Sequence, residues 1–291
     1  MRNLLLFAAA SIFIFSACDD DEDIFKQDRL NLNISGLEDL GDDYAYEGWL
    51  IVDGKPVSAG IFNVDASGAL SQTSFVIDSE DLSNASAYVL TIEPSPDSDP
   101  GPSKVHILAG DFSGSKASLS VSHASAVGTD FLSSTGSYIL ATPTDDADNN
   151  EKSGVWWLDP SADPAATLDL PSLPAGWKYE GWAVIDGVPV TTGKFTSVTG
   201  ADESAPFSGS KAGPPFPGED FLMNAPSGLT FPTDLTGKTV VISVEPEPDN
   251  SAAPFLLKPL VGMVPTDADA HTLYDMSNNA EASNPTGNVT R

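Results

Sequence analysis

The sequence predicts an all-β protein with two tandem β-sandwich-like domains. Three observations support this prediction: apolar and polar residues alternate over short runs, glycine and proline are frequent, and a block of sequence occurs twice. The chain has 24 Gly and 23 Pro among 291 residues, and both residues favour turns. After the N-terminal apolar stretch there is no capped helical pattern of ten or more residues. We therefore expect about six to eight short strands in each domain.

Residues 1–17 have the composition of a secretory signal peptide. Arg2 precedes an apolar stretch over residues 4–15, which is shorter than the about 20 residues of a membrane span. Small residues at positions 16 and 17 then precede Cys18. This end of the stretch resembles the lipobox of bacterial lipoproteins, which implies lipidation of Cys18 and anchoring in the cell envelope. Ordinary signal cleavage beside an incidental cysteine is the alternative.

Residues 18–29 form an acidic tether in which positions 19–23 are all Asp or Glu. The acidic run resembles the surface-export signal of Bacteroidota lipoproteins, which implies an outer-membrane protein exposed at the cell surface. A solvated spacer is the alternative, and in other Gram-negative bacteria an Asp after the lipidated cysteine is associated with retention in the inner membrane.

The repeat gives the domain organisation. Residues 46–62 match residues 179–195 at ten of seventeen positions, and both begin Tyr-Glu-Gly-Trp. Each copy then contains Asp-Gly between β-rich runs, which predicts a hairpin turn. A later block, residues 89–97, matches residues 241–249, and its strand-like run ends at Glu-Pro. We expect the first domain over residues 30–135, the second over residues 136–275 and a polar tail over residues 276–291.

The second copy contains an insertion. Its two blocks lie further apart than those of the first copy, and residues 200–220 are rich in proline and glycine. Long loops without regular structure are often functional. Residues 136–158 between the copies contain two apolar runs around an acidic turn, which predicts a hairpin.

The ordered set of motifs resembles one known domain. An aromatic residue with Glu-x-Trp, then Asp-Gly-x-Pro-Val-x-x-Gly-x-Phe, then an apolar run with Glu-Pro, is similar to the extracytoplasmic C-terminal domain of anti-sigma-K factors. The resemblance covers residues 30–112 and 166–264. It implies a sensory or ligand-binding domain with no catalytic residues, and neither the sigma-binding module nor the membrane helix of the full anti-sigma protein has a counterpart in this sequence.

Composition excludes several function classes. The formal net charge of -29 repels nucleic acid, so we expect no nucleic-acid partner. One cysteine allows no disulfide framework or redox pair. The matched acids Glu47 and Glu180 are candidates for acid–base catalysis, and so are the matched Glu93 and Glu245, but a structural role at strand ends is favoured, so we expect a non-enzymatic protein.

Three groups of residues are candidates for binding. Trp49 and Trp182, beside Glu47 and Glu180, form a candidate glycan platform. A calcium site is a candidate at Asp146, Asp148 and Asn150, whose oxygens alternate as in a calcium loop. This segment lacks the glycine and terminal glutamate of an EF-hand, so a solvated hairpin tip is the alternative. Asp97 and Asp99 are a second calcium candidate.

The sequence thus predicts a lipid-anchored envelope protein that acts in recognition or signalling. It would contact the membrane through its lipid and another envelope protein or a glycan through its domains. The alternative is a surface adhesion or binding module for glycan or calcium, and we expect no other cofactor.

Overall fold

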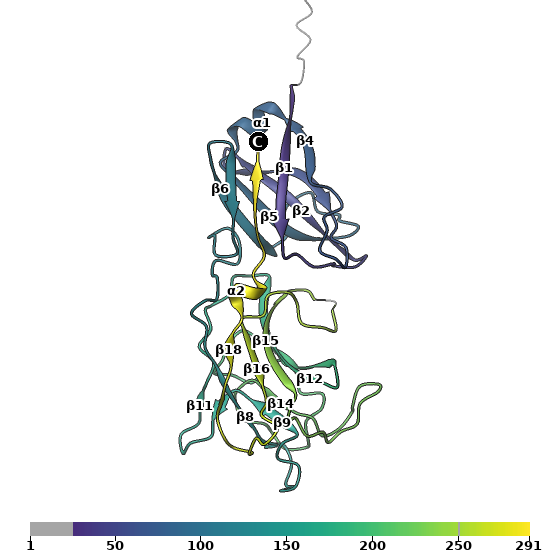
Figure 1. The fold of residues 1–291 in the computed structure, drawn as a ribbon, viewed down its shortest axis with the longest axis vertical. Helices are drawn as coiled ribbons and strands as arrows, with labels where there is room; N and C mark the ends of the chain where they lie inside the picture. The colour runs from purple at the N-terminus through teal and green to yellow at the C-terminus, as the bar shows by residue number, and fades with distance from the viewer. Residues whose placement is uncertain (1–25, 250) are drawn as a thin grey trace, which may run out of the picture.

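The structure is a computed structural model that describes residues 26–249 and 251–291. It confirms an all-β fold built from antiparallel strands. Two units are stacked end to end (Figure 1). We call residues 26–130 with residues 285–291 the first unit, and residues 131–284 the second unit. No helix among the described residues has the length and apolar character needed to cross a membrane.

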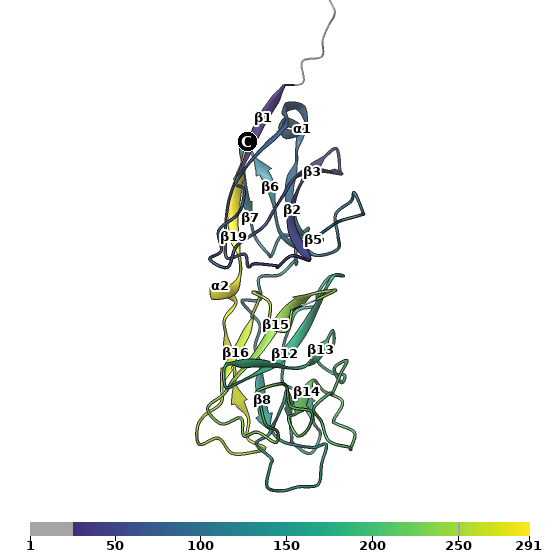
Figure 2. The ribbon, with the colours of Figure 1, turned by 90° about the vertical axis from the view of Figure 1, so that its right-hand side faces the viewer.

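One eight-stranded sheet forms the first unit, in the order β3-β2-β5-β6-β7-β19-β1-β4. Figure 2 shows β1 and β19 on one side of the unit and β2, β3 and β5 on the other, so the sheet folds over into two layers. Strand β6 connects the two layers, because it pairs with β5 along most of its length and with β7 at its end. The elements are β1 (Gln27–Ser35), β2 (Tyr44–Val52), β3 (Lys55–Phe62), β4 (Ser74–Asp78), α1 (Ser79–Asn84), β5 (Ala87–Pro94), β6 (His106–Ser113), β7 (Lys116–Leu119) and β19 (Thr286–Thr290).

The second unit has a five-stranded sheet, β13-β12-β15-β16-β18, a four-stranded sheet, β14-β9-β8-β17, and the pair β10-β11. Its elements are β8 (Ser137–Leu140), β9 (Gly154–Trp156), β10 (Leu158–Asp159), β11 (Ala165–Ala166), β12 (Trp177–Ile185), β13 (Val188–Phe195), β14 (Gly218–Asp220), β15 (Thr239–Pro246), β16 (Leu260–Met263), β17 (Tyr274–Asp275), β18 (Ser277–Asn278) and α2 (Ala280–Ser283).

Both copies contain the hairpin that the repeat predicts. Asp53 and Gly54 connect β2 to β3, and Asp186 and Gly187 connect β12 to β13. All four residues have positive φ angles, as a two-residue turn between twisted strands requires. Each hairpin also has a register shift after the Gly of Tyr-Glu-Gly-Trp. The two copies therefore share backbone irregularities as well as strands.

The hairpin expected in residues 136–158 is confirmed. β8 and β9 pair in antiparallel fashion, and both belong to the four-stranded sheet of the second unit. The inserted segment is mostly irregular until β14, which pairs with β9.

The C-terminal region differs from the expected polar tail over residues 276–291. β18 pairs with β16 in the second unit, and β19 lies in the first unit between β1 and β7. The sequence signal was weak because β19 has one apolar residue among five, Val289, yet this side chain is fully buried. β1 also starts earlier than expected, at Gln27, inside the segment predicted as a tether.

A single cluster of buried apolar side chains extends through both units. It includes Leu30 and Val289 of the first unit and Trp157 and Leu260 of the second. In the second unit, Phe131, the first residue of that unit, packs edge-on against Tyr179 with their ring centroids 6.5 Å apart. The two units therefore share one core.

The position of β19 leads to a stability prediction. Val289→Asp places a charge in the core of the first unit, so we expect the free energy of unfolding to fall by about 3 kcal/mol or more. Thr286→Asp, on the exposed end of the same strand, should change it by about 0.5 kcal/mol or less. Urea denaturation of both variants measures the difference. Equal losses would contradict the structural role of β19.

Candidate functional site

The repeated tryptophans belong to a buried hydrogen-bond network. The Trp49 indole Nε1 donates to Thr91 Oγ1 at 2.9 Å, and the Thr91 hydroxyl donates to the Glu93 carboxylate. The Ser103 backbone N–H also donates to Glu93 Oε1, at 2.8 Å. This chain of bonds links strands β2 and β5 to the loop that follows β5.

The second unit repeats the network with different residues. Trp182 Nε1 donates to Ser243 Oγ at 2.8 Å, and the Ser243 hydroxyl donates to Glu245. The Phe255 backbone N–H donates to Glu245 Oε1 at 3.0 Å. The network is therefore a structural element of the repeat, present in both units.

This burial corrects the prediction of a glycan platform. Trp49 and Trp182 are each 3 % exposed, so neither ring offers a face on which a sugar can stack. The first glutamates of the repeat are also engaged within the sheet. Glu47 accepts a hydrogen bond from the Ser58 hydroxyl, and Glu180 accepts one from Thr191, in both cases across the hairpin.

The remaining residues of Tyr-Glu-Gly-Trp have structural roles as well. The Tyr46 hydroxyl donates to the Glu38 carbonyl at 3.0 Å, and the Tyr179 hydroxyl donates to the Pro171 carbonyl at 2.6 Å. A Cβ on Gly181 would lie 2.5 Å from the Trp157 ring, so only glycine leaves room for this indole. The motif therefore fixes the strand pairs, the entry loop and the core packing together.

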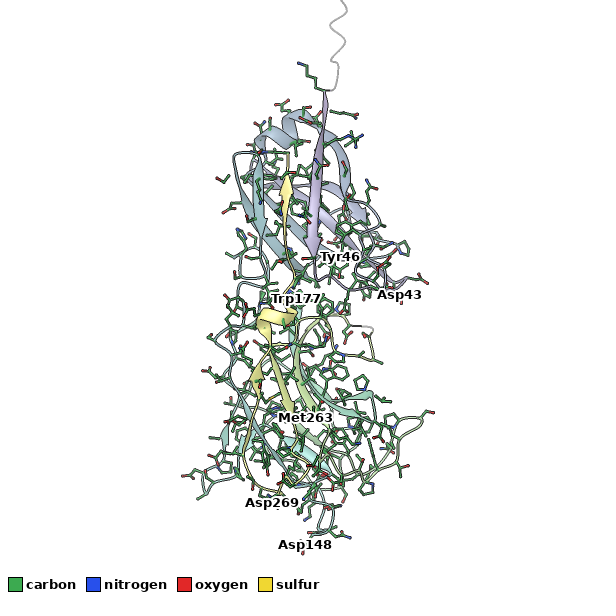
Figure 3. The ribbon with its side chains drawn as sticks, viewed as in Figure 1. Asp43, Tyr46, Asp148, Trp177, Met263 and Asp269 are labelled. Carbon is green, nitrogen blue, oxygen red and sulfur yellow. The ribbon has the colours of Figure 1, made fainter. Side chains whose placement is uncertain are left out.

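In the predicted calcium loop, two of the three candidate ligands already contact other protein groups. Asp146 forms an ion pair with Lys211. Asn150 Oδ1 accepts from Thr142 Oγ1 at 3.1 Å, and its amide donates to Asp145 at 2.7 Å. Asp148 lies at the end of the second unit that is far from the first unit (Figure 3). The segment therefore forms a loop that is held by bonds within itself and by an ion pair to Lys211 of the inserted segment. The sequence pattern does not reveal the ion pair, because Lys211 is distant along the chain.

The cavity with the clearest relation to the repeat is a cleft between the two units. It has a volume of about 520 Å³. Pro94 and Pro246, the last residues of the matched strands β5 and β15, both line it. Tyr46 and Trp177 lie on the two sides of this junction (Figure 3). The other lining residues are Glu38, Asp39, Leu40, Gly41, Tyr44, Ile92, Ser103, Lys104, Val105, Glu247, Pro248, Asp249, Ser251 and Phe255.

The charged side chains in the cleft lining are mostly acidic. Four carboxyl groups line it, from Glu38, Asp39, Glu247 and Asp249, against one ammonium group from Lys104. Burial raises the pKa of Glu38 to about 7, although the Lys258 ammonium and a backbone hydrogen bond from Leu256 favour its charged form. Glu247 and Asp249 already pair with Lys178 and Lys194, so the negative charge that would attract a positively charged ligand comes chiefly from Asp39 and Glu38.

A second pocket lies under the inserted segment of the second unit. It has a volume of about 380 Å³, and Trp156, Asp202 and Lys211 are among its lining residues. Asp220 accepts from Trp156 Nε1 at 2.7 Å and from the Thr144 backbone N–H at 2.8 Å. The insertion is therefore held by buried bonds to β9 and to the loop after β8.

Burial is the main cause of the raised pKa values of the acids in this region. It raises the pKa of Asp202 and of Glu219 to about 7, against hydrogen bonds that favour the charged forms. It also raises the pKa of Asp220, against bonds from Thr144 and Trp156. No described Lys or Arg forms an ion pair with these three acids.

One acidic group was missed by the sequence reasoning. Glu180, Glu245 and Asp249 each place a carboxylate oxygen within 4.8 Å of the others. The repeat contained a signal for it, because Asp97 and Asp249 occupy matched positions in the second block. No pattern in the sequence indicates that the loop after β15 returns to β12.

The buried acids predict how stability depends on pH. Burial raises the pKa of Glu245 to about 8 and that of Glu180 to about 7, from 4.5 in an unfolded chain. Between these values the folded protein binds more protons than the unfolded protein, so the free energy of unfolding falls as pH rises from about 4.5 to about 8. Glu245→Gln should reduce this fall, and urea titrations at pH 5 and pH 8 measure it.

The control is Glu281→Gln, which removes an exposed carboxyl at the start of α2. It should leave the pH dependence as it is in the unmodified chain. An unchanged pH dependence in Glu245→Gln would contradict the assignment of a protonated, buried Glu245.

Comparison with known proteins gives one match. Neither the curated proteins nor the solved structures contain a match to this chain. The model of one protein family, described as anti-sigma-K factor rskA, C-terminal, matches residues 24–105, a segment that includes β1 to β5. The first unit thus contains a segment similar to the C-terminal domain of anti-sigma-K factors, and the internal repeat relates the second unit to the first.

Proposed function

We propose that the chain is a lipid-anchored, non-enzymatic protein of the cell envelope that acts in recognition or signalling. In this proposal it binds a positively charged peptide segment in the cleft between its two units. The observation that carries the proposal is the cleft itself, because the matched strand ends of both copies line it and four carboxyl groups face it. The similarity of residues 24–105 to an anti-sigma-factor domain supports a role in signalling.

The anchor is proposed at Cys18, which lies outside the described residues. β1 starts nine positions later, at Gln27, and nine residues span at most about 32 Å. The first unit would then lie close to the membrane, in the outer leaflet of the outer membrane if the acidic run acts as an export signal. The start of β1 and the second unit lie at opposite ends of the molecule (Figure 1), so the second unit would project outward.

The adhesion alternative has less support than recognition in the cleft. Its glycan arm depended on exposed tryptophans, and Trp49 and Trp182 are buried. Its calcium arm depended on Asp146, Asp148 and Asn150, of which Asp146 and Asn150 bond to other protein groups.

The anchor can be tested by labelling. We expect the full chain to incorporate radioactive palmitate and to sediment with membranes, whereas Cys18→Ser should lose both properties because it has no thiol to acylate. A Cys18→Ser protein that still incorporates palmitate would contradict the proposal. Protease treatment of intact cells then distinguishes surface exposure, in which the protein is degraded, from an inward-facing location.

The cleft can be tested with a tetralysine peptide and the purified full chain. Asp39 is exposed and lines the cleft, whereas Asp163 is exposed and lies outside its lining. Asp39→Lys and Asp163→Lys change the net charge equally. Both variants therefore weaken the non-specific electrostatic attraction between the chain and the peptide to the same extent. We expect Asp39→Lys to weaken peptide binding, measured by calorimetry, about tenfold more than Asp163→Lys. Equal effects of the two variants would contradict binding in the cleft.

A further inference from the structure

The group formed by Glu180, Glu245 and Asp249 joins two strands and a loop. Glu180 lies in the middle of β12, Glu245 lies near the end of the neighbouring strand β15, and Asp249 follows in the loop. One carboxylate oxygen of each residue lies within 4.8 Å of the other two. Oxygens at this spacing can share one ion, because metal–oxygen distances for Ca²⁺ are about 2.3–2.6 Å.

One oxygen in this group has no hydrogen-bond partner among the described residues. The Glu180 side chain accepts from Thr191 through Oε1, while Oε2 is buried and unpartnered. Glu180 is only 5 % exposed, and Glu245 is fully buried. A buried carboxylate oxygen without a donor is costly, so this position requires either a proton or a cation.

We propose that Glu180, Glu245 and Asp249 form a binding site for a divalent cation, with Ca²⁺ as the ion that fits best. The three ligands are carboxylate oxygens, and no described His belongs to the group. Hard oxygen ligands in irregular geometry suit Ca²⁺ better than transition metals. Asp249 also lines the cleft between the units, so water can complete the coordination from that side.

Lys194 is the group that the ion must displace. Its Nζ lies 3.2 Å from Asp249 Oδ2 and 3.4 Å from Glu247 Oε2. When Asp249 coordinates the ion, Lys194 retains the ion pair with Glu247. A site whose ligands partly serve another cation binds its ion weakly, so we expect a dissociation constant in the range of about 10⁻⁴–10⁻³ M that is typical of extracellular calcium modules.

The first unit provides a matched comparison. Its corresponding acids are Glu47, Glu93 and Asp97, but Asp97 is exposed, and these acids are absent from the groups of converging ligands in the described part of the chain. Position 61, which corresponds to Lys194, is an exposed isoleucine. The proposed site is therefore specific to the second unit, although the acids themselves are duplicated.

The experiment titrates Ca²⁺ into the purified full chain, with Mg²⁺ and NaCl at matched ionic strength to measure general screening of the net charge. We expect a saturable rise in melting temperature with Ca²⁺ that Mg²⁺ at the same concentration does not reproduce. Tb³⁺ luminescence gives a second readout, because Trp182 is linked through Ser243 to Glu245 and can sensitise an ion at this position.

Variants assign the site. Glu180→Gln and Asp249→Asn should each weaken Ca²⁺ binding tenfold or more, while Glu47→Gln in the first unit should leave it unchanged. Lys194→Met should strengthen binding, since it removes the competing ammonium. If Glu180→Gln fails to fold, Asp249→Asn alone tests the site.

The proposal is overturned if the unmodified chain gives no saturable Ca²⁺ signal, or if the signal persists in Asp249→Asn. Peptide binding in the cleft is measured without Ca²⁺, so each proposal can fail alone.

Discussion

The pairing of β19 on both of its edges is the constraint on which the arrangement of the two units depends. The chain leaves the first unit after β7, builds the second unit, and returns to place β19 between β1 and β7. Two chain segments therefore cross the junction, and the buried Val289 secures the second crossing. The units also share one cluster of buried apolar side chains, and the cleft between them has walls supplied by both copies.

Buried carboxyl groups are the second organising feature. Glu93 and Glu245 each accept hydrogen bonds from a hydroxyl and from a backbone N–H of the following loop. Burial of a polar group is tolerated when its hydrogen bonds are satisfied. The indoles of Trp49 and Trp182 donate to the same hydroxyls, so each network connects the core to a loop at the cleft. This explains why the repeat kept its Glu-Pro segment: the glutamate positions the loop that lines the cleft.

The sequence was informative where structure depends on local patterns and uninformative where it depends on distant partners. Asp-Gly predicted both hairpins because positive φ angles are a local property, and the repeat predicted the two copies of the sheet. β19 could not be predicted, because a five-residue strand with one buried side chain has no distinctive period. The candidate residues Trp49 and Trp182 were identified correctly as repeated, but their burial depends on which face of the sheet packs inward. Asp249 approaches Glu180 and Glu245 only because its loop folds back onto β12.

The two copies keep one framework and differ in charge at equivalent positions. Where the first unit has Ala45, Ile61 and Ser95, the second has Lys178, Lys194 and Glu247. Lys178 and Lys194 both pair with Glu247, so the second unit surrounds its buried acids with an ion-pair network that the first unit lacks. Hydrogen bonds suffice to hold Glu93 in the first unit, so these added charges are not needed for the framework. They lie beside the cleft and the converging carboxylates of the second unit. Divergence after duplication thus changed the electrostatics of one unit at its junction with the other, while the hairpin bulges and the tryptophan networks of both copies stayed alike.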